Sequence, residues 1–145
     1  NLKNYFIKKY FLPDIPIKIS KYLFNIANSS IDISDGLFAD LNKLIDNQKI
    51  GYTINANKIP ISKNLNKYLK KSNKNLLHYV SKGDDYQILF TSPKIRRKYI
   101  KKLSKRINLK ITQIGCTTNK KNERKIIKGK NLLKPINYKG YSHKF

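Results

Sequence analysis

Apolar side chains recur at helical spacing in three segments of the chain. Residues three, four or seven positions apart lie on one face of a helix, so each segment predicts a helix with one buried side. The stripes are Ile19, Tyr22, Leu23 and Ile26; Leu37, Leu41, Leu44 and Ile45; and Ile95, Tyr99, Leu103 and Ile107. The second helix is expected from Gly36 to about Gln48, and Pro93 begins the third. Shorter helices are expected over 62–71 and 76–80, while residues 2–11 fit a helical or an extended segment.

Strand-like runs alternate with these helices. They cover residues 29–33, 52–56, 86–91, 109–116 and 124–128. The run 86–91 is almost continuously apolar, which is typical of a strand buried on both faces. A polar turn at 117–122 predicts that the last two strands form a hairpin. Because helices and strands are intermixed, we expect an α/β or α+β fold with a mixed sheet.

The length of 145 residues suits one domain or one half of a two-domain enzyme. Pro13 and Pro16 interrupt helical structure. We therefore expect residues 1–13 to be a linker or the end of a preceding domain, and 14–145 to form one domain. The chain opens on Asn1, so we also expect a fragment or a cleaved chain.

No apolar run reaches the roughly 18 residues that span a membrane, and lysines interrupt the apolar residues of 2–11, unlike in a secretory signal. Cys116 is the single cysteine, and a lone thiol fits a reducing cytoplasm, which is the expected location.

The formal net charge of +24 raises the question of nucleic-acid binding. The lysines are spread over the whole length, however, and the abundant residue types share A/T-rich codons, so base composition alone could produce the lysines. The tyrosines fall largely on core-like stripes. A nucleic-acid partner is therefore not expected, although the charge should attract phosphorylated small molecules to a cleft.

Three of the 8 acidic residues, Asp32, Asp35 and Asp40, fall within "NSSIDISDGLFADL". On a strand, Asp32 and Ser34 project to the same side while Ile33 points to the core. Asp35 begins the following turn, Gly36 permits a tight backbone, and the next helix offers free N–H groups to a phosphate. The oxygens of these side chains are of the kind that binds Mg²⁺, so we expect a magnesium site here. The alternative is that Ser34 or Asp35 caps the helix and that Asp32 is merely exposed. Asp40, one turn into the helix, is expected to be solvated or favoured by the helix dipole rather than to be a ligand.

A second acidic turn, Gly83-Asp84-Asp85-Tyr86, precedes the apolar strand. If both turns open on one edge of the sheet, they build one acidic pocket, which needs cations to offset its self-repulsion. The alternative is an ordinary acidic turn, which Gly and Asp favour.

The blocks "IDISDGLFADLNKL", "GYTINANKIPIS", "KGDDYQILFT" and "GYSHKF", with "YFLPDIPIKISKYL" before them, occur in this order. Together they resemble the C-terminal half of thiamine-monophosphate kinase, of the aminoimidazole ribonucleotide synthetase-like superfamily. The resemblance implies the C-terminal domain of that fold and ATP-dependent phosphorylation of thiamine monophosphate to thiamine diphosphate. It also implies that Asp32 and Asp35 bind Mg²⁺, that Ser34 contacts ATP, and that Asp84 and Tyr141 contact the thiamine substrate.

The chain departs from the family pattern at several positions: Lys82 replaces Gly, Asp84 replaces Glu, Gln87 replaces an acidic residue, and a lysine is inserted in the tail. The resemblance further implies that an N-terminal half supplies most metal and nucleotide ligands and much of a homodimer interface. This chain alone is therefore expected to have little or no kinase activity. Two alternatives stay open at this point, namely a basic RNA- or polyanion-binding module and a degenerate, non-catalytic relative.

Overall fold

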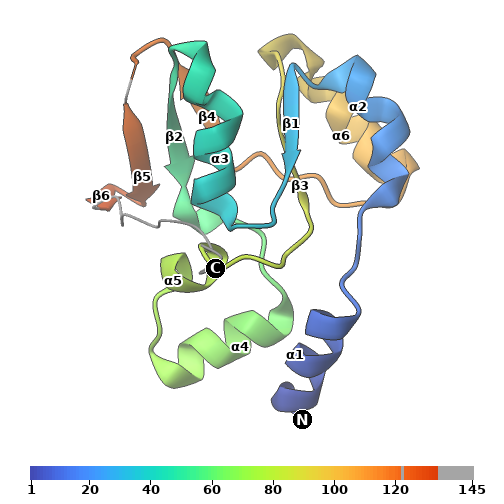
Figure 1. The fold of residues 1–145 in the computed structure, drawn as a ribbon, viewed down its shortest axis with the longest axis vertical. Helices are drawn as coiled ribbons and strands as arrows, with labels where there is room; N and C mark the ends of the chain where they lie inside the picture. The colour runs from blue at the N-terminus through green and yellow to red at the C-terminus, as the bar shows by residue number, and fades with distance from the viewer. Residues whose placement is uncertain (122, 134–145) are drawn as a thin grey trace, which may run out of the picture.

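The computed structural model describes residues 1–121 and 123–133, in which helices and strands are intermixed (Figure 1). The α-helices are α1 (Leu2–Phe11), α2 (Ser20–Ile26), α3 (Leu37–Ile45), α4 (Lys63–Ser72), α5 (Leu76–Val80) and α6 (Arg97–Arg106). The strands are β1 (Ser29–Asp32), β2 (Gly51–Asn55), β3 (Ile88–Thr91), β4 (Gly115–Thr118), β5 (Arg124–Lys128) and β6 (Asn131–Leu133). Single 3₁₀ turns precede α2 and α6 and follow α3 and β2.

The strands form two separate sheets. The larger sheet has the order β4-β2-β5-β6, with β2 antiparallel to β4 and parallel to β5, and β5 antiparallel to β6. The smaller sheet is the antiparallel pair β1–β3, in which Asp32 lies opposite Ile88. The predicted α/β class with a mixed sheet is thus confirmed.

Helix α3 carries the main hydrophobic core. Its predicted stripe is largely buried, with Leu37, Leu41 and Ile45 packed together with Tyr52 of β2 and Ile126 of β5. Figure 1 shows α3 between the four-stranded sheet and the β1–β3 pair. The N-terminal end of α3 is therefore fixed by a packed core at the place where the first acidic bend enters it.

A second cluster joins α2 to α6 around Ile19, Ile26 and Leu103. Strand β3 serves both clusters, because Ile88 and Phe90 pack on the second while Leu89 packs on the first. Alternate side chains of a strand point to opposite faces, so the predicted two-sided strand is present. It is half-buried rather than fully buried, and it begins at Ile88 instead of residue 86.

The predicted hairpin between the last two long strands is wrong. β4 and β5 do not pair, because β2 inserts between them and pairs with both. The expected strand 109–116 is also displaced to Gly115–Thr118. Pairing with β2 is a long-range contact, which the local run of apolar and turn residues does not contain.

Some aromatic and apolar residues of the predicted stripes are exposed rather than buried in the core. In α6 and the turn before it, Leu103 is buried, but Ile95 and Tyr99 are exposed by 88% and 44%. Among the tyrosines that the structure describes, Tyr52 alone is buried, so the expectation that tyrosines lie mainly in the core is wrong. Helical spacing identifies a face, but it does not show whether another element covers that face.

Candidate functional site

The two acidic bends are in direct contact. The amide of Asp84 donates to the carbonyl of Ser34 at 2.9 Å, and the amide of Tyr86 donates to the carbonyl of Ile33 at 2.9 Å. In return, the amide of Ile33 donates to the carbonyl of Gln87 at 2.8 Å. These bonds continue the β1–β3 pairing beyond the ends of both strands. The sequence prediction that the two bends meet is therefore correct.

Glycines make this close approach sterically feasible. A Cβ atom on Gly83 would lie 2.0 Å from the carbonyl oxygen of Ser34, and one on Gly36 would lie 2.4 Å from that of Ser81. Gly36 also has φ of 111°, a conformation that side chains disfavour. The first bend thus packs on both the second bend and the end of α5 through backbone atoms that tolerate no side chain.

The second bend holds strained backbone at residues that are not glycine. Asp84 and Tyr86 have φ of 67° and 50°. Such conformations cost on the order of 1–3 kcal/mol each and cluster at functional sites, where surrounding contacts maintain them. Here the backbone bonds from Asp84 and Tyr86 to the first bend supply that support.

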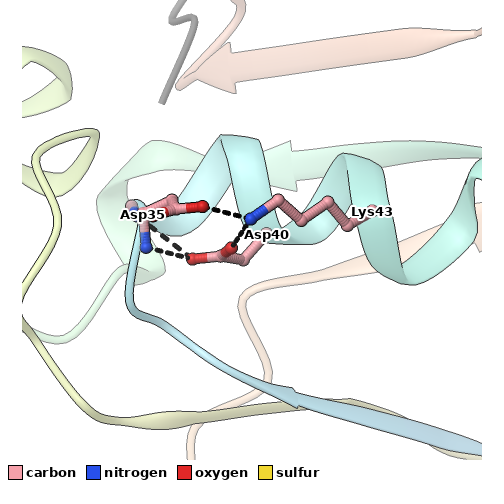
Figure 2. Close-up of polar contacts among 4 residues, drawn as sticks. Asp35, Asp40 and Lys43 are labelled. Atoms are coloured by element: carbon pink, nitrogen blue, oxygen red, sulfur yellow. Dashed lines mark hydrogen bonds and ion pairs between the residues drawn. The ribbon is translucent and has the colours of Figure 1, made fainter. Parts of the chain in front are cut away.

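Asp40 organises the first bend from within α3. Its side chain is fully buried, and its Oδ2 accepts from the amides of Asp35 at 2.9 Å and Gly36 at 3.1 Å (Figure 2). Its Oδ1 accepts from the Lys43 ammonium at 3.1 Å. Asp40 is therefore not solvated, and its place in the first turn of α3 fits the other expectation, that of a carboxylate favoured by the helix dipole. The alternative in which Ser34 or Asp35 caps the helix is wrong, because Gly36 is the N-cap and makes no side-chain capping bond.

Lys43 joins Asp40 to Asp35. Its ammonium contacts Oδ2 of Asp35 as well as Oδ1 of Asp40, and it lies between the two carboxylates in Figure 2. Hydrogen bonds to Asp35 and then to Asp40 raise the pKa of Lys43, so the side chain is charged. Sequence reasoning did not single out Lys43. The available signal was its position three residues after Asp40 on the same helix, which places the two side chains together.

The Tyr86 side chain is hydrogen-bonded to Asp84 within the second bend. Its hydroxyl donates to Oδ1 of Asp84 at 3.1 Å. That hydrogen bond is the first cause of a raised pKa for Tyr86, and the charges of Asp84 and Asp32 also contribute. Asp32 is exposed at the end of β1.

Asp85 is the most perturbed carboxyl group of the site. Desolvation of the group, and then the charge of Asp84, raise its pKa to about 6. The residue as a whole keeps exposed surface, so solvent screens part of this effect. A nearby cation would stabilise the ionised form of carboxylates that are crowded in this way.

Gln87, which departs from the family pattern, has a structural contact. Its amide nitrogen donates to the backbone carbonyl of Asp14 at 2.9 Å and to that of Asp85 at 3.3 Å. It therefore ties the Pro13–Pro16 segment to the second bend. A carboxylate at this position could accept but not donate these bonds.

The oxygen donors fit part of a magnesium site. Asp32, Asp35 and Ser34 offer the hard ligands that Mg²⁺ prefers, and Mg²⁺ usually takes one or two carboxylates together with waters and phosphate oxygens. In residues 1–121 and 123–133, no group of three His, Cys, Asp or Glu side chains could hold a metal by itself. The remaining ligands would have to come from a phosphate, from water or from further protein. Tyr141 lies outside the described residues.

Comparison with known proteins finds relatives of this chain among the thiamine-monophosphate kinases. A thiamine-monophosphate kinase of Buchnera aphidicola from Schizaphis graminum is 44% identical over 113 residues, which are 78% of this chain and 34% of that protein. The kinase of Leptospira interrogans is 30% identical over 98% of this chain and 43% of its own length. The chain is homologous to part of the thiamine-monophosphate kinases. No family model matches it.

Solved kinase structures share the fold. A structure described as AaThiL complexed with AMPPCP and TMP superposes with a TM-score of 0.74 at 31% identity, over 98% of this chain and 42% of that one. Thiamine monophosphate kinase from Aquifex aeolicus gives a TM-score of 0.70 over 88% and 42%. The chain thus spans about two fifths of these thiamine-monophosphate kinases, consistent with the expected C-terminal half. Among the described residues, no helix is long and apolar enough to cross a membrane.

Proposed function

We propose that this chain forms the C-terminal half of an ATP-dependent thiamine-monophosphate kinase that converts thiamine monophosphate to thiamine diphosphate. The observation that carries the proposal is the backbone contact between the two acidic bends, at Ser34–Asp84 and Ile33–Tyr86. It joins the block that is expected to bind metal and nucleotide to the block that is expected to bind substrate. The solved relative that was described with AMPPCP and TMP supports the same pair of ligands.

In this proposal the first bend holds the nucleotide side of the reaction. Asp32 and Asp35 would bind Mg²⁺, and the hydroxyl of Ser34 would contact ATP. Bound Mg²⁺ would neutralise charge on the transferring phosphoryl group. The buried Asp40 fixes the backbone of Asp35 and Gly36, and therefore the position of the Asp35 side chain. Positioning of this kind, rather than a covalent intermediate, carries most of the catalysis in phosphoryl transfer.

The second bend holds the substrate side. Asp84 would contact thiamine monophosphate, and Tyr141 would line the same site. Asp84 is one methylene shorter than the Glu of the family pattern, and a water could bridge the difference. Its carboxylate is already oriented by the hydroxyl of Tyr86 at 3.1 Å.

An N-terminal half is required for activity in this proposal, and the complete kinase is a cytoplasmic homodimer. The relatives are more than twice as long as the part that this chain covers. The N-terminal part of the described chain exposes large apolar side chains that a further domain could cover. These are Tyr10, Phe11, Leu12, Ile15, Ile17 and Phe24. Residues 1–13 would then be the linker or the end of that domain, and 14–145 the C-terminal domain.

A kinase assay on the full-length protein tests this function. Conversion of thiamine monophosphate with ATP and Mg²⁺ is expected for the natural sequence and not for the 145-residue chain alone. Asp35→Asn should lower kcat by at least about a hundredfold, since it removes a metal ligand. Asp46→Asn is the matched control, because Asp46 is an exposed acid at the other end of α3. Equal rates for natural protein and Asp35→Asn would defeat the metal-ligand role.

A further inference from the structure

We propose that Lys43 is a built-in counter-cation that competes with the divalent cation for the Asp35 carboxylate. This inference rests on the proposed function, because it takes Asp35 to be a metal ligand. It goes further in assigning a role to Lys43, a side chain for which the resemblance implies none. Lys43 would lower the affinity for the cation, and its contact with Asp35 would weaken when the cation binds.

The ammonium group of Lys43 lies at the carboxylate that is proposed to bind the cation. Lys43 contacts Oδ2 of Asp35, one of the two oxygens of the carboxylate that the proposed function assigns to Mg²⁺. A metal ion and an ammonium that contact the same carboxylate repel each other, because both are positively charged. Binding of the cation should therefore weaken the Lys43–Asp35 contact or displace Lys43 from Asp35.

The Lys43 ammonium has a second carboxylate partner, so it stays paired when it leaves Asp35. Lys43 is also paired with Oδ1 of the buried Asp40 at 3.1 Å, while Oδ2 of Asp40 is occupied by the amides of Asp35 and Gly36. The two oxygens of Asp40 thus serve separate purposes. One fixes the backbone of the bend, and the other holds Lys43 within reach of Asp35. Loss of the Lys43 charge should leave the backbone bonds of the bend in place.

The Lys43–Asp35 ion pair is accessible to solvent. The Lys43 side chain is 53% exposed and that of Asp35 is 32% exposed, whereas that of Asp40 is 1% exposed. The Lys43–Asp35 contact is therefore a partly solvated ion pair, which contributes little stability and breaks readily. An ammonium so placed can yield to a cation of double charge, which makes it a modulator of affinity rather than a block.

The test is the affinity for Mn²⁺, used as a spectroscopic substitute for Mg²⁺, measured on the full-length protein from the electron paramagnetic resonance signal of free Mn²⁺. Lys43→Met keeps the apolar stem and removes the charge, so it should bind Mn²⁺ about tenfold more tightly. Lys43→Arg keeps the charge and should bind like the natural protein. Lys67→Met, at an exposed lysine of α4, removes the same net charge elsewhere and corrects for the overall field. In Asp35→Asn, the further change Lys43→Met should have no effect.

The outcomes separate this inference from the proposed function. If Asp35→Asn weakens binding but Lys43→Met leaves it unchanged or weaker, the competing role of Lys43 is overturned and the metal-ligand role of Asp35 stands. If Asp35→Asn binds Mn²⁺ as tightly as the natural protein, the metal-ligand role fails, and the competition fails with it. An equal gain in Lys67→Met and Lys43→Met would also overturn the inference, since the effect would then be one of net charge alone.

Discussion

Replacement of Gly36 by Ala should destabilise the protein strongly, because two independent effects act at this residue. Its φ of 111° and ψ of 150° lie in a region that essentially only glycine occupies, which costs alanine about 1–3 kcal/mol. The new Cβ would also lie 2.4 Å from the carbonyl oxygen and 2.6 Å from the carbonyl carbon of Ser81. Forcing these backbones apart adds about 1–3 kcal/mol. We therefore expect the free energy of unfolding to fall by about 2–6 kcal/mol.

Urea unfolding followed by circular dichroism measures this loss. Gly129→Ala is the matched control, because Gly129 also has positive φ, 62°, but a Cβ there meets nothing within 4 Å. It should lose only about 1 kcal/mol, the cost of a left-handed backbone. Similar losses in the two variants would show that contact between the first bend and α5 contributes nothing, which would refute the packing argument for this site.

Three further predictions concern side chains of the two bends. Asp40→Ala should lower the free energy of unfolding by about 3 kcal/mol, because the amides and the lysine that Asp40 binds lose a buried partner; a loss below about 1 kcal/mol in urea unfolding would contradict its structural role. Carboxyl-detected NMR should give Asp85 a pKa of about 6 in the metal-free protein, and Asp84→Asn should lower it. Since this pKa is raised on folding, the stability that Asp85 contributes is present below its ordinary value of 3.8 and is lost as pH rises through about 6, so Asp85→Asn should flatten that part of the stability curve. Gln87→Ala should speed amide hydrogen exchange in the segment around Asp14, and unchanged exchange would show that the contact does not hold that segment.

The local pattern of apolar residues predicted the helices and strands better than it predicted which elements pack or pair with each other. The stripes of α2 and α3 identified buried faces, since Ile19, Ile26, Leu41 and Ile45 all lie in a core. The β4–β5 hairpin failed because β2 separates the two strands, and nothing in residues 117–122 encodes a third strand. The exposure of Ile95 shows the same limit, since helical spacing does not reveal which faces remain uncovered.

The part of the candidate site that could be predicted is the part formed by acidic residues that are clustered in the sequence. The scarcity of carboxylates in a basic chain drew attention to Asp32, Asp35 and Asp84, and the two bends that carry them are in contact. The roles of Asp40 and Lys43 were not predicted, because a carboxylate one turn into a helix is usually solvated. Its burial depends on the core that α3 forms with β1 and β2, which the local sequence does not describe.

The central claim is that the two acidic bends form one cation site. The most direct test is paramagnetic line broadening by Mn²⁺ in the NMR spectrum of the full-length, ¹⁵N-labelled protein. We predict that substoichiometric Mn²⁺ broadens the amide signals of both bends, 32–36 and 83–86, that Asp35→Asn abolishes the broadening, and that the signals of β6 stay sharp. Broadening of one bend without the other, or broadening that persists in Asp35→Asn, would contradict the account.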